Sequence, residues 1–135
     1  MITRTNPDVG YVDESTFASL GFSQVVRAND TVYYSGIAPF TGAPPEFNVI
    51  GTGSMEQQVL FLMDILERCL DSESQTLENL VAVTVYATDV PALMATAEIF
   101  AKKFGVAPPA STWLGVTALA HPDQLVELTA TAVDL

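Results

Sequence analysis

The positions of apolar and polar residues along the chain predict strands and helices in alternation. Residues 22–36 contain two runs rich in β-branched and aromatic residues, and Ala28-Asn29-Asp30 between them is typical of a hairpin turn. Residues 37–53 hold three prolines and three glycines, which predicts a loop. From residue 54 to 70 the apolar residues recur every three or four positions, which predicts a helix that packs against a sheet. These apolar residues are Val59, Leu62, Met63, Leu66 and Leu70.

The second half of the chain has the same alternation. A β-branched run at 80–89 predicts a strand, and Asp89 follows as the expected N-cap of a helix that ends at Gly105. Two further strands, turned around by "HPDQ", are expected at 111–118 and 125–133. The predicted order is β-β-α-β-α-β-β, an α+β sheet with both helices on one face. The other face of the sheet has no helix to bury it. Packing against copies of the same chain is the simplest way to bury this face.

Composition favours a single domain, residues 1–135, that assembles with itself. Nearly half of the residues are hydrophobic, 49%, and the mean hydropathy of +0.32 is high for a soluble monomer. No apolar run approaches the ~20 residues that span a bilayer, and the first ten residues lack the apolar stretch of a signal peptide. A buried subunit interface explains the excess of apolar residues better than a membrane does. The one cysteine, Cys69, fits a reducing cytoplasm and is expected in the core.

The charge of the chain argues against some classes of binding partner. Sixteen acidic and five basic residues give a net charge of −11, and the basic residues form no cluster. Because phosphate backbones are bound mainly through lysine and arginine, this charge argues against nucleic acid and against an anionic membrane surface. His121 is the only histidine; it lies in an expected turn, where we predict an exposed surface residue. With scattered carboxylates around one histidine, no metal-ligand spacing is present, and we expect no metal.

Four segments together resemble the RidA family, also called YjgF or L-PSP. They are "FSQVVRANDTVYYSGIAP", "LENLVAVTVYATDVPAL", "FGVAPPAS" and "LVELTATAV", in that order between Phe22 and Val133. The resemblance implies a chorismate-mutase-like α+β fold, a homotrimer, and small-molecule pockets between neighbouring subunits. It also implies hydrolysis of reactive enamines and imines made from amino acids, giving a 2-oxo acid and ammonia without metal or organic cofactor. An endoribonuclease activity is sometimes attached to the family name, and the charge argues against it here.

The chain departs from this family where the deaminating members hold their substrate. In those members proline-alanine is followed by an arginine that grips the substrate carboxylate, whereas Ser111 stands here. The family's pocket tyrosine falls on Phe22, an asparagine of the second helix on Ala97, and a glutamate linked to water activation on Thr129. These four changes predict a pocket that no longer prefers amino-acid-derived anions.

The remaining residues suggest where chemistry takes place. Glu127 shares a strand face with Thr129 and is a candidate acid or base, with an interface hydrogen bond as the alternative. Ser111 is the second catalytic candidate, although it has no base nearby in the sequence and fits better as a hydrogen-bonding pocket residue. The expected ligand-binding residues are Phe22, Gly36, Ile37, Trp113 and Thr129. Gly36 either lets a ligand approach the backbone closely or is simply a turn glycine that ends a strand. Trp113 either forms a flat wall for a planar compound or packs in a subunit interface.

These residues predict a RidA-like enzyme with an altered intersubunit pocket. It would hydrolyse or tautomerise an enamine-like, imine-like or planar unsaturated metabolite. A non-catalytic trimer that binds a small molecule is the alternative.

Overall fold

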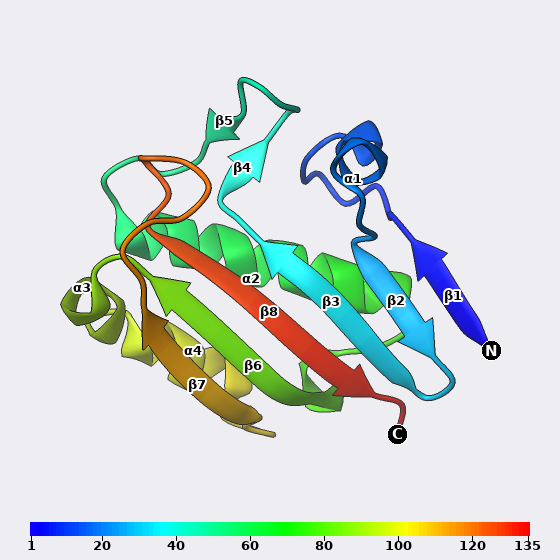
Figure 1. Cartoon of the computed structure of the whole chain (residues 1–135). Coiled ribbons are helices and arrows are strands. Elements are labelled where there is room, and N and C mark those ends of the chain that lie inside the picture. The colour runs from blue at the N-terminus through cyan, green and yellow to red at the C-terminus, as the bar shows by residue number, and fades with distance from the viewer.

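A six-stranded sheet forms the framework of the computed structural model, which describes all residues 1–135 (Figure 1). The strand order is β1-β2-β3-β8-β6-β7, in which β6 and β7 run parallel and every other neighbouring pair is antiparallel. The strands are β1 (Ile2–Thr5), β2 (Val25–Ala28), β3 (Thr31–Ile37), β6 (Leu80–Ala87), β7 (Ala110–Gly115) and β8 (Val126–Val133). Two short strands, β4 (Phe40–Thr41) and β5 (Asn48–Val49), pair inside the proline- and glycine-rich loop.

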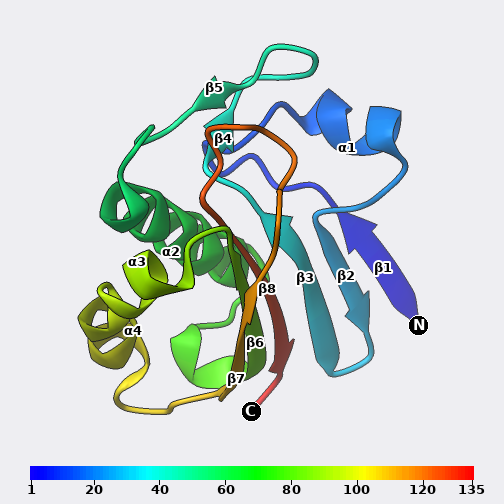
Figure 2. The same ribbon diagram turned by 60° about the vertical axis from the view of Figure 1, so that its left-hand side comes forward.

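The helices of the core cover one face of this sheet, as the sequence predicts. Figure 2 shows α2 (Met55–Ser72), α3 (Val90–Met94) and α4 (Ala97–Phe104) on the same side, while α1 (Glu14–Leu20) lies beyond the ends of β1 and β2. A short 3₁₀ helix, η1 (Leu77–Asn79), leads into β6. None of these helices combines the length and the apolar character needed to cross a bilayer.

The core lies between α2 and the sheet, and strand alternation decides which side chains enter it. In β8 the even-numbered residues from Val126 to Ala132 are buried, and the odd-numbered residues, Glu127 among them, lie half-buried on the opposite face. The predicted apolar stripe of α2 is buried throughout. Cys69 has no exposed surface, and burial raises the pKa of its thiol to about 12. Its prediction as a core residue is confirmed.

Three features differ from the expected elements. The single helix expected between Asp89 and Gly105 is two helices, because Thr96 interrupts it: its backbone N–H and its hydroxyl both donate to the carbonyl of Leu93, the latter at 2.7 Å. The strand β1 and the helix α1 were not expected, since all four side chains of β1 are exposed and show no alternation. The last two strands, β7 and β8, are not neighbours, because β6 lies between them.

A bulge in β3 shapes the upper end of the sheet. Tyr34 pairs with Ala130 and Ile37 pairs with Leu128, so β3 holds one residue more than β8 over this interval. The extra residue falls at Ser35–Gly36, and such bulges turn the following side chain to a new direction. Ile37 consequently points into the core, where it is fully buried.

Candidate functional site

A cavity of 390 Å³ opens beside the β3 bulge. Its walls come from α1, the β4 segment, the end of β3 and the start of β8. This volume suits a small molecule. Nine of its thirteen lining residues are hydrophobic, and five of them are aromatic: Tyr11, Phe17, Phe22, Phe40 and Phe47. Phe22 meets Phe17 edge-on at 5.4 Å between ring centroids, and Phe40 stacks on Phe47 at 4.7 Å. Three predicted site residues, Phe22, Gly36 and Glu127, line this one cavity.

Glu127 is the only charged residue in the lining, and its carboxylate lies against Gly36. A Cβ atom added to Gly36 would lie 2.6 Å from Oε2 of Glu127, which is closer than real Cβ atoms come to other atoms. The glycine therefore leaves the space that the carboxylate occupies. The backbone of the β3 bulge and the side chain of Glu127 form one surface of the cavity.

Gln124 holds the other carboxylate oxygen in place. This residue is buried, and its Nε2 donates at 3.2 Å both to Oε1 of Glu127 and to the carbonyl of Val126. Its own Oε1 accepts from the backbone N–H of Ala120 at 3.0 Å, which fixes the amide orientation. Burial raises the pKa of the Glu127 carboxyl above its ordinary value, and the hydrogen bond from Gln124 opposes that change. A raised pKa makes a carboxylate a stronger proton acceptor than an exposed one.

Tyr11 is a lining residue that the sequence reasoning missed. Its hydroxyl oxygen accepts a hydrogen bond from the backbone N–H of Ala38 at 2.7 Å. Burial, and to a smaller extent the charge of Glu127, raise the pKa of this phenol, so it keeps its proton. Phe22 stands where the resemblance expects a pocket tyrosine, and Tyr11, on another segment, supplies a phenol to the cavity. No spacing in the sequence marks Tyr11, because it belongs to no helix or regular strand.

The candidates on β7 lie elsewhere in the same chain. Ser111 pairs with Val83, and Trp113 pairs with Val85, so both face the helix side of the sheet. They line a groove of 380 Å³ along α4, and the Trp113 ring lies 5.2 Å from that of Phe100. Glu127 faces the opposite side, so one chain does not bring these residues into a single site.

Thr129 also lies apart from the aromatic cavity. It shares the helix-free face with Glu127, as predicted, but lines a separate hollow of 210 Å³ with Tyr33, Thr84 and Thr131. Ala97, expected to replace a pocket asparagine, is the exposed first residue of α4.

Two expectations need correction. Ile37 was expected to contact a ligand, but the β3 bulge directs its side chain into the core. His121 was expected to be exposed; instead it is half-buried, and its Nδ1 accepts from the backbone N–H of Asp123 at 3.0 Å. Its ring meets Phe40, a wall of the cavity, at 6.0 Å between centroids. The structure contains no group of three or more His, Cys, Asp or Glu side chains placed to hold a metal ion.

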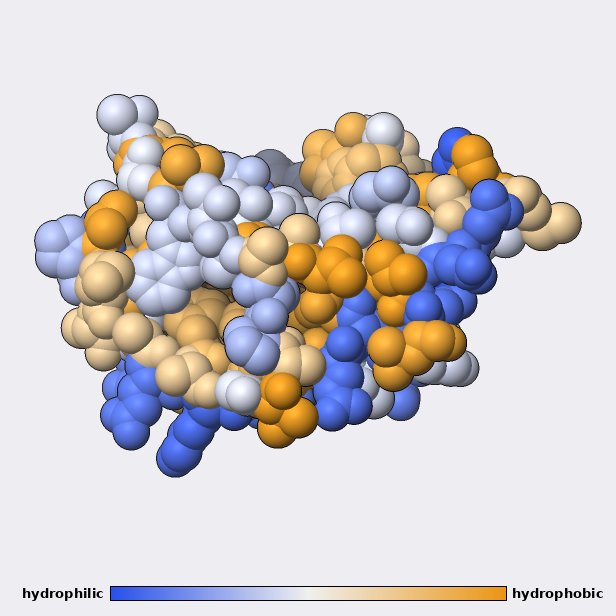
Figure 3. All heavy atoms as spheres, turned by 90° about the horizontal axis from the view of Figure 1, so that it is seen from below, coloured by the Kyte–Doolittle hydropathy of each residue, from blue (hydrophilic) through white to orange (hydrophobic).

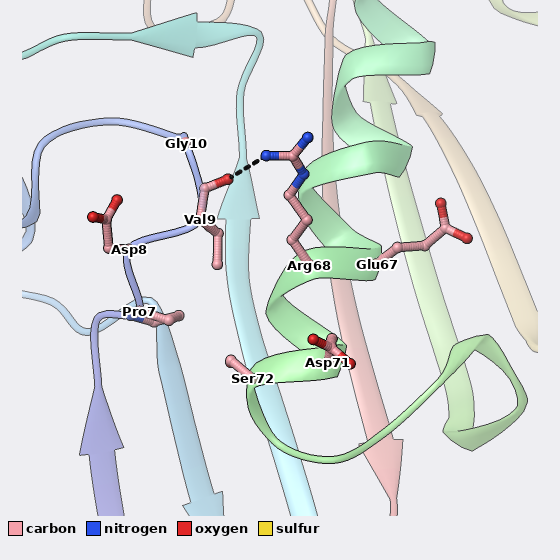
Figure 4. Close-up of a pocket in the computed structure, with 8 residues that line it drawn as sticks. All are labelled: Pro7, Asp8, Val9, Gly10, Glu67, Arg68, Asp71 and Ser72. Carbon is pink, nitrogen blue, oxygen red and sulfur yellow. Dashed lines mark hydrogen bonds between the residues drawn. The ribbon is translucent and has the colours of Figure 1, made fainter.

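Other parts of the surface have a different character. A polar hollow of 660 Å³ lies between residues 7–10 and α2. Its lining residues are drawn in Figure 4, where Arg68 donates to the carbonyl of Val9; the distance is 3.3 Å. Arg68 also pairs with Asp64 at 3.1 Å, so its charge is already balanced. Seen from below, apolar side chains form separate groups interrupted by hydrophilic ones (Figure 3). The aromatic cavity differs from this polar hollow because it combines an apolar lining with a half-buried carboxylate.

Comparisons with known proteins place the chain in a family. The family model described as endoribonuclease L-PSP matches residues 14–134. A RutC family protein of Saccharolobus solfataricus is 28% identical over 111 residues, which cover 82% of this chain and 85% of that protein. The mitochondrial protein MMF1 of Saccharomyces cerevisiae is 28% identical over 102 residues, covering 76% of this chain and 68% of that protein.

Solved structures agree in fold. The crystal structure of yeast Mmf1 has a TM-score of 0.84 and 24% identity, with both chains covered completely. The structure of RidA from the Antarctic bacterium Psychrobacter has a TM-score of 0.80 and 20% identity over 98% of this chain and all of that one. The expected α+β fold is confirmed, and the chain belongs to the L-PSP family, whose members are also called YjgF and RidA proteins.

Proposed function

We propose that this protein hydrolyses the carbon–nitrogen bond of a small imine, or of the enamine that tautomerises to it, in the cavity that holds Glu127. Membership of a family that processes small molecules supports this class of activity. The observation that carries the proposal is the Glu127 carboxylate, whose Oε2 lies over Gly36 and accepts no hydrogen bond from the chain.

Glu127 supplies the proton transfers that such a hydrolysis needs. The carboxylate takes a proton from water while the water oxygen bonds to the imine carbon, and the C=N π electrons move to nitrogen. The protonated carboxyl then returns that proton to the nitrogen of the carbinolamine. As the C–N bond breaks, the carboxylate takes the proton of the carbinolamine hydroxyl and passes it to the leaving nitrogen, so a carbonyl forms and ammonia leaves. The sum is imine plus water to carbonyl compound plus ammonia, with no redox step.

We further propose that the working form is a homotrimer in which β7 of one subunit completes the cavity of its neighbour. Ser111 and Trp113 cannot reach their own Glu127, because they face the other side of the sheet. Because β7 is an edge strand and nearly all of its residues are exposed, a neighbouring subunit can reach both of its faces. The helix-free face also keeps exposed apolar side chains: Tyr33 is 51% exposed and Leu114 is 45% exposed. In such an assembly Ser111 would offer a neutral hydrogen bond where deaminating members offer an arginine.

Ammonia release tests the proposal. One substrate is the enamine that a dehydratase releases from serine, and the other is an N–H aryl ketimine that carries no carboxylate; background hydrolysis is subtracted from both. We expect faster turnover of the ketimine, and loss of that turnover by at least about a hundredfold in Glu127→Gln, which keeps the shape but cannot accept the proton. Glu78→Gln, which removes one charge at an exposed residue of η1, is the matched control and should retain full turnover.

The Ser111→Arg variant tests the loss of the carboxylate anchor. We expect it to improve turnover of the serine-derived enamine relative to the ketimine. Robust turnover of the amino-acid-derived enamine by the wild-type protein would contradict the altered specificity. Full activity in Glu127→Gln would contradict the catalytic role. Native mass spectrometry of the same samples gives the subunit number, and a monomer would contradict the intersubunit site.

A further inference from the structure

The aromatic cavity has an unusual balance of charge. Five aromatic rings and one carboxylate line it, and no lysine, arginine or histidine does. The basic side chains lie elsewhere, three of them in ion pairs: Arg27 with Glu73 at 2.9 Å and Asp134 at 2.6 Å, Arg68 with Asp64 at 3.1 Å, and Lys103 with Glu67 at 3.0 Å. Arg4 is in β1 and Lys102 is in α4. The half-buried carboxylate of Glu127 is therefore left without a counter-ion.

Polar groups of the cavity are also left without partners. The Oγ1 atom of Thr16 is buried and makes no hydrogen bond, although the residue is only 3% exposed and lines the cavity. Oε2 of Glu127 accepts no hydrogen bond, and its other oxygen is held by Gln124. Because leaving a buried polar atom unpaired is costly, Oγ1 of Thr16 favours a ligand with a polar group, and the free Oε2 of the half-buried Glu127 adds a second acceptor in the same cavity.

We infer that this cavity binds a compact organic cation, an ammonium or iminium group on an apolar or aromatic body. The positive group pairs with Glu127, donates a further N–H to Thr16, and lies among the faces of the aromatic walls. The apolar body fills the remaining space. This inference rests on the proposed function only in its choice of cavity, and it deepens that function by naming the charge of the ligand.

Two physical effects favour a cation over an anion or a neutral molecule. The faces of aromatic rings carry negative charge and attract cations, an effect that grows where water is excluded. A partly buried carboxylate gains more from an opposite charge than an exposed one does, because the surrounding dielectric is low. An anion in the same position would be repelled by Glu127 with no basic residue to compensate. The net charge of −11 also attracts cations toward the protein.

The inference is tested by calorimetric titration at neutral pH with three probes of one shape. These are 2-phenylethylamine as the cation, 2-phenylethanol as the neutral isostere and 3-phenylpropanoate as the anion. We expect the amine to bind at least about tenfold more tightly than the alcohol, a difference of about 1.4 kcal/mol, and the anion to bind most weakly. Backbone amide NMR shifts of Gly36 and Gln124 on addition of the amine then place it in this cavity.

Matched variants separate charge from packing. In Glu127→Gln the amine should lose its advantage, so that amine and alcohol bind within about threefold of each other, while the affinity for the alcohol stays unchanged. Glu78→Gln, with the same change in net charge, should keep the full preference. A preference for the anion, an amine preference that survives in Glu127→Gln, or shifts confined to β7 would each overturn the inference. Binding of the amine without ammonia release from any imine would uphold this inference while contradicting the proposed hydrolysis.

Discussion

The carboxylate of Glu127 occupies the space that a side chain at Gly36 would fill. Oε2 lies 2.6 Å from the position of a Cβ atom on that glycine. The carboxylate comes from β8 and the glycine from the bulge of β3, so the contact depends on the exact pairing of two central strands. A half-buried acid is thereby brought to the backbone of a largely apolar cavity.

The first prediction concerns Gly36→Ala. The methyl group displaces the carboxylate, and because a displacement of about 1 Å in a catalytic group is costly, kcat/KM for the ketimine should fall roughly 10- to 100-fold. The conflict is with the end of a flexible side chain, so the free energy of unfolding should change by no more than about 1 kcal/mol. Steady-state ammonia release and thermal unfolding measure the two effects. Unchanged activity would show that the position of the carboxylate does not matter.

The second prediction follows from the raised pKa of Glu127. A carboxyl whose pKa is raised in the folded state stabilises the fold below its ordinary pKa of 4.5, and this contribution is lost as the pH rises through the folded pKa. Glu127 is faced by the phenol of Tyr11 and the amide of Gln124. Neither group changes its charge between pH 4.5 and neutral pH. Glu127→Gln should therefore have a higher Tm than the wild-type protein at neutral pH.

The same comparison in acid supplies the control. Below pH 4.5 the wild-type carboxyl is protonated, and the two Tm values should converge. A wild-type protein that gains stability over Glu127→Gln as the pH rises would reverse the sign and contradict the burial of this group.

The third prediction treats Gln124 as a positioning residue. Gln124→Leu removes the amide that donates to Glu127 and leaves the N–H of Ala120 without its acceptor. We expect unfolding to become easier by about 1–3 kcal/mol, and the acidic limb of the pH–rate profile to move to higher pH, because the carboxylate loses a hydrogen bond. Gln57→Leu makes the same change at an exposed site of α2 and should alter neither the free energy of unfolding nor the pH–rate profile. A lower stability without any shift of the pH profile would leave Gln124 a purely structural role.

The fourth prediction concerns the thiol of Cys69. Because it is buried and its pKa is raised to about 12, almost no thiolate is present or accessible at neutral pH. Ellman's reagent should detect no thiol in the folded protein and one per chain after denaturation. Rapid reaction in the folded state would mean that α2 opens readily.

The sequence allowed the core elements to be predicted because each of them has a clear period. The odd and even positions of β8 separate buried from half-buried side chains, and the apolar residues of α2 follow a helical period. The first strand escaped prediction because a short, fully exposed edge strand has no such signal. The break at Thr96 also escaped, since it depends on a hydroxyl that bonds to Leu93 rather than on glycine or proline.

The candidate site was predicted in part. Glu127 and Gly36 were identified, and the structure brings them together although 91 positions of the sequence separate residues 36 and 127. Strand alternation could not foresee that a bulge would turn Ile37 into the core. Tyr11 was missed because its place depends on tertiary contacts, with Phe17, Phe61 and Ala38, rather than on local pattern.

The position of β8 has a consequence for synthesis of the chain. This strand is made after the other five, yet it joins β3 on one side to β6 on the other. A nascent chain that ends before residue 126 therefore consists of two separate ribbons, each with an open hydrogen-bonding edge. Such ribbons invite wrong pairing between molecules, so protection by chaperones matters most in the interval before this strand leaves the ribosome.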